Sequence, residues 1–225
     1  ELKTMISSTS KPILALSYNQ TYSYEYYKTS EEERIDLLML AAQAGVSAVD
    51  MQAYSFDIEA KDKFFEEFAT EEMAFAAANP KEIALNPEII KKQKELIDTF
   101  HSMGTEVLMS CHTGVPMNCE QVISLALEIE KRNPDIIKIV TPCENDEQLI
   151  EAFKTILELK KAIKKSRIHF HCQGKAGKLT RIVNPMLGSY QMFRANRYTQ
   201  SSNYEQLHLK TMVDAFRTLD WSNKE

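Results

Sequence analysis

The stretch EVLMSCHTGVPMNCEQVISLALEIEKRNPDIIKIVT, residues 106–141, carries the pattern that decides the fold. It begins and ends with short apolar runs, residues 106–112 and 136–141, which are typical of buried strands. Between them, Asn118 opens a longer segment of helical period. Because two parallel strands need a long crossover between them, usually a helix, this order predicts a βα unit of a parallel sheet.

The same unit recurs along the chain, as expected for a single α/β domain of 225 residues. Six strands fit either an open doubly wound sheet or most of an eight-stranded TIM (β/α)8-type barrel. The expected strands are Pro12–Tyr18, Ala48–Tyr54, Glu106–His112, Ile136–Thr141, Ile168–Gln173 and Tyr190–Ala195.

Helix starts are marked by capping residues. Ser30 and Glu33 form a capping box, and Gly45 ends the helix that follows them. Asn86, followed by proline, predicts a second N-terminus. Further helices are expected from Asn118, from Asn145 and over Tyr204–Leu219, and residues 58–83, too long for a bare loop, are expected to form a helical insertion.

Composition narrows the class of protein. A hydrophobic fraction of 44% and a charged fraction of 26% exclude a disordered or fibrous chain. The net charge of −5 argues against nucleic acid and anionic membranes as partners. The four cysteines show no C-x-x-C spacing and no apolar run approaches a membrane span, so we expect reduced thiols and a cytoplasmic protein.

Lys138 is the most informative candidate for chemistry, because it interrupts the apolar strand Ile136–Thr141. Burial would lower the pKa of its ammonium group, and the neutral amine attacks a ketone or aldehyde to form a Schiff base. The alternative is a lysine at the sheet edge that faces solvent. His112 ends the preceding strand and could move protons if Lys138 lies beside it, although a lone histidine there is more often a surface residue.

Three other patterns resemble functional sites. His169 and His171 could bind a metal, but no third ligand is evident, so we predict no metal and no cofactor. Cys111 as a nucleophile activated by its neighbour His112 is rejected, because adjacent strand residues point to opposite faces. Gly174–Arg181 is expected to be a cation-rich loop that lacks phosphate-loop spacing, so Arg181 would more reasonably bind a carboxylate.

Several segments, in order along the chain, resemble the type I 3-dehydroquinate dehydratases. They are Lys11–Leu14, the strand reaching Asp50, Met109–His112, Ile137–Ile139 with Pro142, Gly174-Lys175 through Thr180-Arg181, Gly188-Ser189 with Phe193, and Ser202 with Gln206. The resemblance implies a barrel lyase in which Lys138 forms an imine with 3-dehydroquinate and His112 moves protons. Arg181 would bind the substrate carboxylate, and Ser202 and Gln206 would lie on a loop that closes over it.

The chain departs from this family at residues expected to contact substrate. Tyr18 stands where an arginine is usual, Gln52 where a glutamate is common, and His171 and Gln173 replace methionines. We therefore keep open a Schiff-base enzyme for a different keto acid, and a homologue that binds a carboxylate ligand without catalysis. Gln52 and Tyr18 remain candidates for substrate binding.

The resemblance also implies that two strands of the barrel precede Glu1, so we expect the 1–225 domain to be incomplete at its N-terminus. The expected partner is a small keto or hydroxy acid, with no nucleic acid and no membrane. A homodimer is left open.

Overall fold

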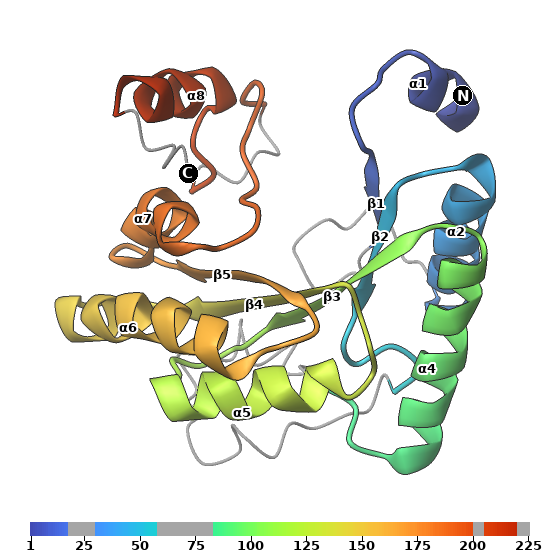
Figure 1. Ribbon diagram of the computed structural model, residues 1–225, viewed down its shortest axis with the longest axis horizontal. Coiled ribbons are helices and arrows are strands. Elements are labelled where there is room, and N and C mark those ends of the chain that lie inside the picture. The colour runs from blue at the N-terminus through green and yellow to red at the C-terminus, as the bar shows by residue number, and fades with distance from the viewer. Residues whose placement is uncertain (18–29, 58–82, 200–204, 220–225) are drawn as a thin grey trace.

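A parallel sheet of five strands, β1-β2-β3-β4-β5 in space as in sequence, forms the centre of the computed structural model (Figure 1), which describes residues 1–17, 30–57, 83–199 and 205–219. The strands are β1 (Leu14–Leu16), β2 (Ala48–Gln52), β3 (Glu106–His112), β4 (Ile136–Pro142) and β5 (Arg167–Gln173). The helices are α1 (Leu2–Ser7), α2 (Glu31–Ala44), α4 (Pro87–Ser102), α5 (Cys119–Glu130), α6 (Asp146–Ala162), α7 (Thr180–Leu187) and α8 (Leu209–Thr218), with a 3-10 turn η2 at Gly177–Leu179.

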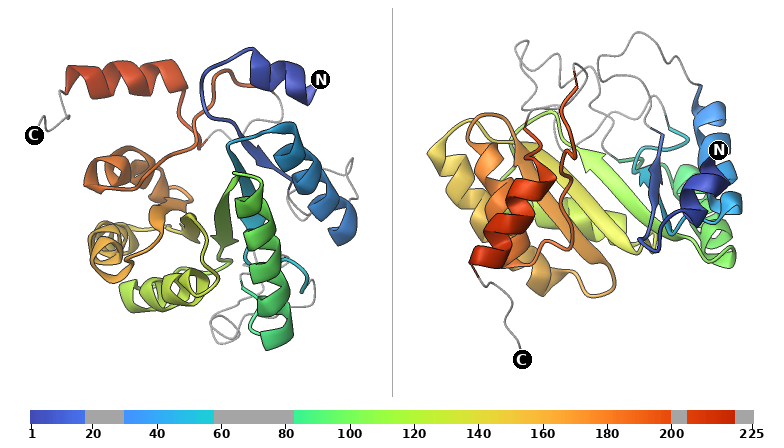
Figure 2. Two further views of the ribbon diagram at one scale, coloured as in Figure 1. Left: turned by 45° about the vertical axis from the view of Figure 1, so that its right-hand side comes forward. Right: turned by 90° about the horizontal axis from the view of Figure 1, so that it is seen from above.

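The helices α2, α4, α5 and α6 cover one face of the sheet, and the strands curve away from them in an arc (Figure 2). Alternate strand residues face these helices and form a core with their apolar sides, as the period of two along a strand requires. The strand members of this core are Val49, Met51, Val107, Met109, Cys111, Ile137, Ile139, Ile168, Phe170 and Cys172. The residues between them therefore line the opposite, concave face.

The helix starts predicted from the capping residues Ser30, Asn86, Asn118 and Asn145 are confirmed, because capping depends on local sequence. Ser30 and Glu33 close a capping box at the start of α2, and Gly45 ends it in the left-handed conformation. Asn86 caps α4, and Asn118 and Asn145 cap α5 and α6. The insertion expected over 58–83 lies outside the described residues except for Ile83, which is buried.

The sixth expected strand, Tyr190–Ala195, does not form. Tyr190 N–H donates to the Ile168 carbonyl, but side chains occupy the outer backbone edge of β5 beyond it. Ser189 Oγ accepts from the Phe170 N–H at 3.1 Å, and Thr180 Oγ1 accepts from the Cys172 N–H at 2.8 Å. Asn184 Nδ2 donates to the Phe170 carbonyl at 2.9 Å. A strand at this edge would find these backbone groups occupied, so the prediction was wrong for a reason that lies in α7 and the turn after it.

Other boundaries also differ from the prediction; β2, for example, ends at Gln52 instead of Tyr54. Arg181 lies in α7, whereas the sequence predicts a loop through that residue. The last helix begins at Leu209 instead of Tyr204, because the backbone before it is extended: Ala195 N–H donates to the Leu207 carbonyl, and Leu209 N–H donates to the Ala195 carbonyl. Within the described ranges no helix is long and apolar enough to cross a membrane.

Candidate active site

A row of polar side chains crosses the concave face of the sheet, from the carboxyl end of β2 to the interior of β4 and β5. Gln52, Ser110, Lys138 and His169 are successive partners in register on β2, β3, β4 and β5. Partners at the same register of parallel strands point to the same face, so these four side chains lie side by side. All four are buried, with at most 3% of each residue exposed.

Lys138 is 3% exposed, so the interpretation of a solvent-facing lysine is wrong and the expected burial is confirmed. Its Nζ lies 3.5 Å from Asp50 Oδ2 and 4.7 Å from the centre of the Phe193 ring. Burial lowers the pKa of Lys138, the Asp50 carboxylate opposes that shift, and Arg181 adds to it. The amine is therefore easier to deprotonate than a lysine in water.

Three imidazoles, which we call the histidine cluster (His112, His169 and His171), lie on the same face of the sheet as this amine. His169 Nε2 and His171 Nδ1 are 3.0 Å apart and share a hydrogen bond. His169 and His171 are buried and His112 is half-buried. The loss of hydration lowers the pKa of each member well below 6.5, and the positive charges of Lys138 and Arg181 lower it further. The cluster is consequently neutral at pH 7, and each ring can both donate and accept a hydrogen bond.

Arg181 supplies positive charge at the edge of the site. The residue is 3% exposed, and its Nη2 lies 3.3 Å from Glu205 Oε2. Its Nε is buried and has no hydrogen-bond partner within the described parts of the chain. Burial lowers the pKa of Arg181 and the Glu205 carboxylate opposes the shift, so the guanidinium stays charged. Arg194 donates to the Arg181 carbonyl and adds a second cation, whose pKa burial lowers to about 10.

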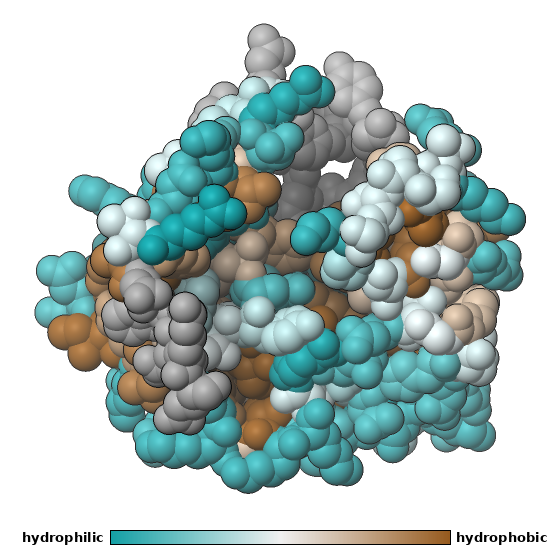
Figure 3. All heavy atoms as spheres, turned by 45° about the horizontal axis from the view of Figure 1, so that its top comes forward, coloured by the Kyte–Doolittle hydropathy of each residue, from teal (hydrophilic) through white to brown (hydrophobic). Residues whose placement is uncertain are grey.

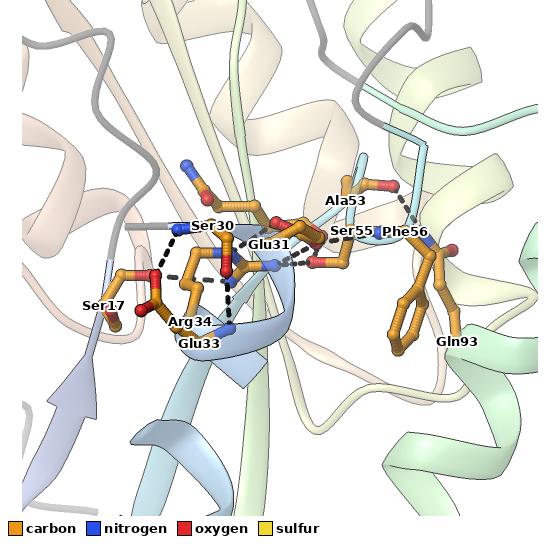
Figure 4. Close-up of polar contacts among 10 residues, drawn as sticks. Ser17, Ser30, Glu31, Glu33, Arg34, Ala53, Ser55, Phe56 and Gln93 are labelled. Carbon is orange, nitrogen blue, oxygen red and sulfur yellow. Dashed lines mark hydrogen bonds and ion pairs between the residues drawn. The ribbon is translucent and has the colours of Figure 1, made fainter. Parts of the chain in front are cut away.

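A network of polar contacts holds the segment that follows β2, at the carboxyl end of the sheet (Figure 4). Arg34, fully buried on α2, donates to Glu31 and to Ser55 Oγ, and Ser55 Oγ donates to the Gln52 carbonyl at 2.6 Å. Gln93 Nε2 donates to the carbonyls of Ala53 and Ser55. This network fixes the end of the strand that carries Asp50 and Gln52.

The remaining predicted substrate-binding residues fall in different places. Gln52 belongs to the buried row described above. Gln206 is half-buried, and its carbonyl accepts a hydrogen bond from Tyr198 Oη at 2.7 Å. Tyr18 and Ser202 lie outside the described residues. Figure 3 shows the molecule hollowed near the centre of one face, with hydrophilic side chains on both sides of the hollow.

Sequence reasoning missed two acidic residues of the site. Asp50 appeared only as the end of a matching segment, yet an acid in the otherwise apolar strand AVDM is the same kind of signal that identified Lys138. Glu205 gave no signal, because nothing in its surrounding sequence relates it to Arg181, 24 residues earlier.

The fold is that of TIM-barrel-like α/β enzymes. The 3-dehydroquinate dehydratase from Geobacillus kaustophilus HTA426 has a similar structure (TM-score 0.69, 14% identity, 95% of this chain and 69% of that chain). So has the type I 3-dehydroquinate dehydratase from Clostridium difficile, solved with covalently modified comenic acid (TM-score 0.72, 15% identity, 97% and 73%). The carboxyl transferase domain of Rhizobium etli pyruvate carboxylase shares the fold over 32% of its chain (TM-score 0.59, 14% identity, 96% of this chain).

The family model for type I 3-dehydroquinase matches residues 1–222. The chain therefore belongs to the type I 3-dehydroquinase family, whose members are hydro-lyases that act on a small molecule. No curated protein sequence matched the chain.

Proposed function

We propose that this chain dehydrates 3-dehydroquinate to 3-dehydroshikimate through an imine on Lys138. The observation that carries the proposal is the buried Lys138 amine, held 3.5 Å from Asp50 on the face that also bears the histidine cluster. Burial lowers the pKa of this amine and so increases its neutral fraction, which is the nucleophilic form. Family membership supports the same chemistry.

In the proposed reaction the Lys138 lone pair attacks the ketone carbon, and the carbonyl oxygen takes up protons and leaves as water. The imine then withdraws electrons from the adjacent carbon, so a base can remove a proton there. Departure of the hydroxyl from the next carbon as a second water forms the carbon–carbon double bond. One water then hydrolyses the imine and restores the amine, so the net change is loss of one water.

The neutral imidazole of His112 is suited to carry these protons, since it both accepts and donates at pH 7. Asp50 offsets the positive charge of the protonated imine, because it is a buried carboxylate within reach of the same nitrogen. We assign substrate contacts to Arg181, for the carboxylate, and to Gln52, for a hydroxyl group. Tyr18, Ser202 and Gln206 are further proposed contacts.

Borohydride reduction tests the covalent step, because it converts an imine to a stable amine. Intact mass measurement after incubation with 3-dehydroquinate and borohydride should show one adduct, and peptide mapping should place it on Lys138. Lys138→Met should abolish the adduct and the turnover. Lys154→Met, which changes an exposed lysine on α6, should retain both.

Absence of any adduct at millimolar 3-dehydroquinate would end the proposal. A second candidate, a Schiff-base enzyme for a different keto acid, is favoured by the neutral side chains of Gln52, His169 and His171 in the site. Adducts with small keto acids such as pyruvate, but none with 3-dehydroquinate, would select it. We also propose that the protein acts in the cytoplasm, in the shikimate pathway or in quinate catabolism.

A further inference from the structure

The guanidinium of Arg181 already pairs with a carboxylate of the protein, that of Glu205. Glu205 Oε1 accepts a hydrogen bond from the Gly174 N–H at 2.9 Å, and Glu205 Oε2 lies 3.3 Å from Arg181 Nη2. Glu205 thus uses both of its oxygens, one on the backbone after β5 and one on a buried cation of α7. This is the arrangement by which proteins bind the carboxylate of a small ligand.

The groups that bind the Glu205 carboxylate are held in place by the fold. Arg181 is 3% exposed and fixed in α7, and the Gly174 N–H is aimed by a backbone with φ +91°, a conformation that glycine adopts readily. Arg181 Nε, also buried, has no hydrogen-bond partner in the described ranges. Arg181 and the Gly174 N–H, which together we call the cradle, therefore donate to one carboxylate from two sides. The cradle keeps one further donor, Arg181 Nε, that Glu205 does not use.

We propose that Glu205 is a specificity-determining residue, which occupies the position of the ligand carboxylate and must be displaced before an acidic substrate binds. The inference rests on the proposed function only for the identity of that substrate. Two carboxylates cannot share one cradle without repulsion, so ligand and Glu205 compete. The apparent dissociation constant of the acidic ligand then equals its intrinsic value divided by the fraction of molecules in which Glu205 has left Arg181.

The competition also discriminates among ligands. A ligand whose acidic group reaches both the Gly174 N–H and Arg181 Nε can replace the contacts of Glu205, whereas a neutral ligand gains nothing from displacing it. Glu205 therefore weakens the binding of every carboxylate at Arg181 and leaves the binding of uncharged analogues unchanged. The proposed role concerns affinity and does not involve the imine.

The experiment uses the full chain and two probes that lack a ketone and form no imine, quinate and its methyl ester. Calorimetric titrations compare the wild-type protein with Glu205→Gln, which keeps the size of the side chain and a carbonyl acceptor for the Gly174 N–H. Quinate should bind Glu205→Gln at least about tenfold more tightly than the wild type, since a hydrogen-bonded charge is released for the ligand. The methyl ester should bind both proteins equally.

Glu144→Gln is the matched control, because it removes one negative charge from an exposed side chain close to Gly174 that does not bind Arg181. It should leave the quinate affinity within about twofold of the wild type, the size of a screened surface effect. Glu205→Ala should tighten quinate binding in the same direction as Glu205→Gln, which guards against misfolding of one variant. Thermal unfolding verifies that each variant is folded.

Quinate that binds Glu205→Gln no more tightly than wild type, or not at all, would overturn the inference. Equal tightening for quinate and its methyl ester would also overturn it, since a general loosening of the site would be responsible. The proposed function is tested separately: it is wrong if 3-dehydroquinate and borohydride give no adduct.

Discussion

Replacing Arg34 with methionine should reveal how strongly the polar network behind β2 stabilises the protein. Arg34 is fully buried, and its guanidinium donates to Glu31 Oε2 at 2.9 Å, to Glu31 Oε1 at 2.6 Å and to Ser55 Oγ at 2.6 Å. Removing one partner of a buried ion pair costs about 3–5 kcal/mol. Glu31 keeps 15% of its side chain in solvent and still accepts from the Phe56 N–H, so we expect the lower end, about 3 kcal/mol.

Methionine fills most of the volume of arginine and leaves little cavity. The decrease in the free energy of unfolding therefore measures mainly the lost polar contacts. Equilibrium urea unfolding measures it as a change in the free energy of unfolding. The control is Lys161→Met, which breaks a 2.7 Å pair with Glu158 whose side chains are 71% and 39% exposed; its cost should stay below about 1 kcal/mol. If the free energy of unfolding of Arg34→Met lies within about 0.5 kcal/mol of the wild-type value, as it does for most surface substitutions, the argument from buried contacts is wrong.

The remaining predictions concern the site and the loop beside it. Asp50→Asn should shift the acid limb of the borohydride-trapping rate to lower pH, because Asp50 raises the pKa of Lys138 against burial; an unchanged limb contradicts the pairing. The histidine cluster, whose pKa values are lowered on folding, should make the free energy of unfolding fall as pH drops below 6.5, by up to about 1.4 kcal/mol per pH unit for each histidine. Urea titrations between about pH 7.5 and 5.5 measure this slope, and a flat profile would disprove the buried neutral state. Gly174→Ala should cost about 1–3 kcal/mol, since φ is +91° and the added carbon would lie 2.9 Å from the Cys143 carbonyl; Gly104→Ala, at φ +75° with open space, should cost less in the same assay.

Much of the fold could be read from the sequence, because the signals are local. The capping box at Ser30 and the N-cap at Asn118 place helix starts correctly, since a cap is satisfied by residues three positions away. The last expected strand does not form because the side chains of Thr180, Asn184 and Ser189 bind the backbone groups with which it would pair on β5. No local pattern in Tyr190–Ala195 could have shown this.

The candidate site divides in the same way. Lys138 stands out in sequence because a charged residue in an apolar strand carries a desolvation cost that invites a functional explanation. Its burial, its partner Asp50 and the hydrogen bond between His169 and His171 depend on the register of neighbouring strands, which brings together residues far apart in the chain.

The amino-acid sequence alone determined the βα repeat, the helix starts set by caps, and the presence of a lysine within an apolar strand, because each depends on spacing within a few residues. Only the tertiary structure decided which side chains face that amine and that the carboxylate of Glu205 lies on Arg181. The physical reason is that burial and charge pairing are properties of what surrounds a group in space, and strand pairing and helix packing set those surroundings.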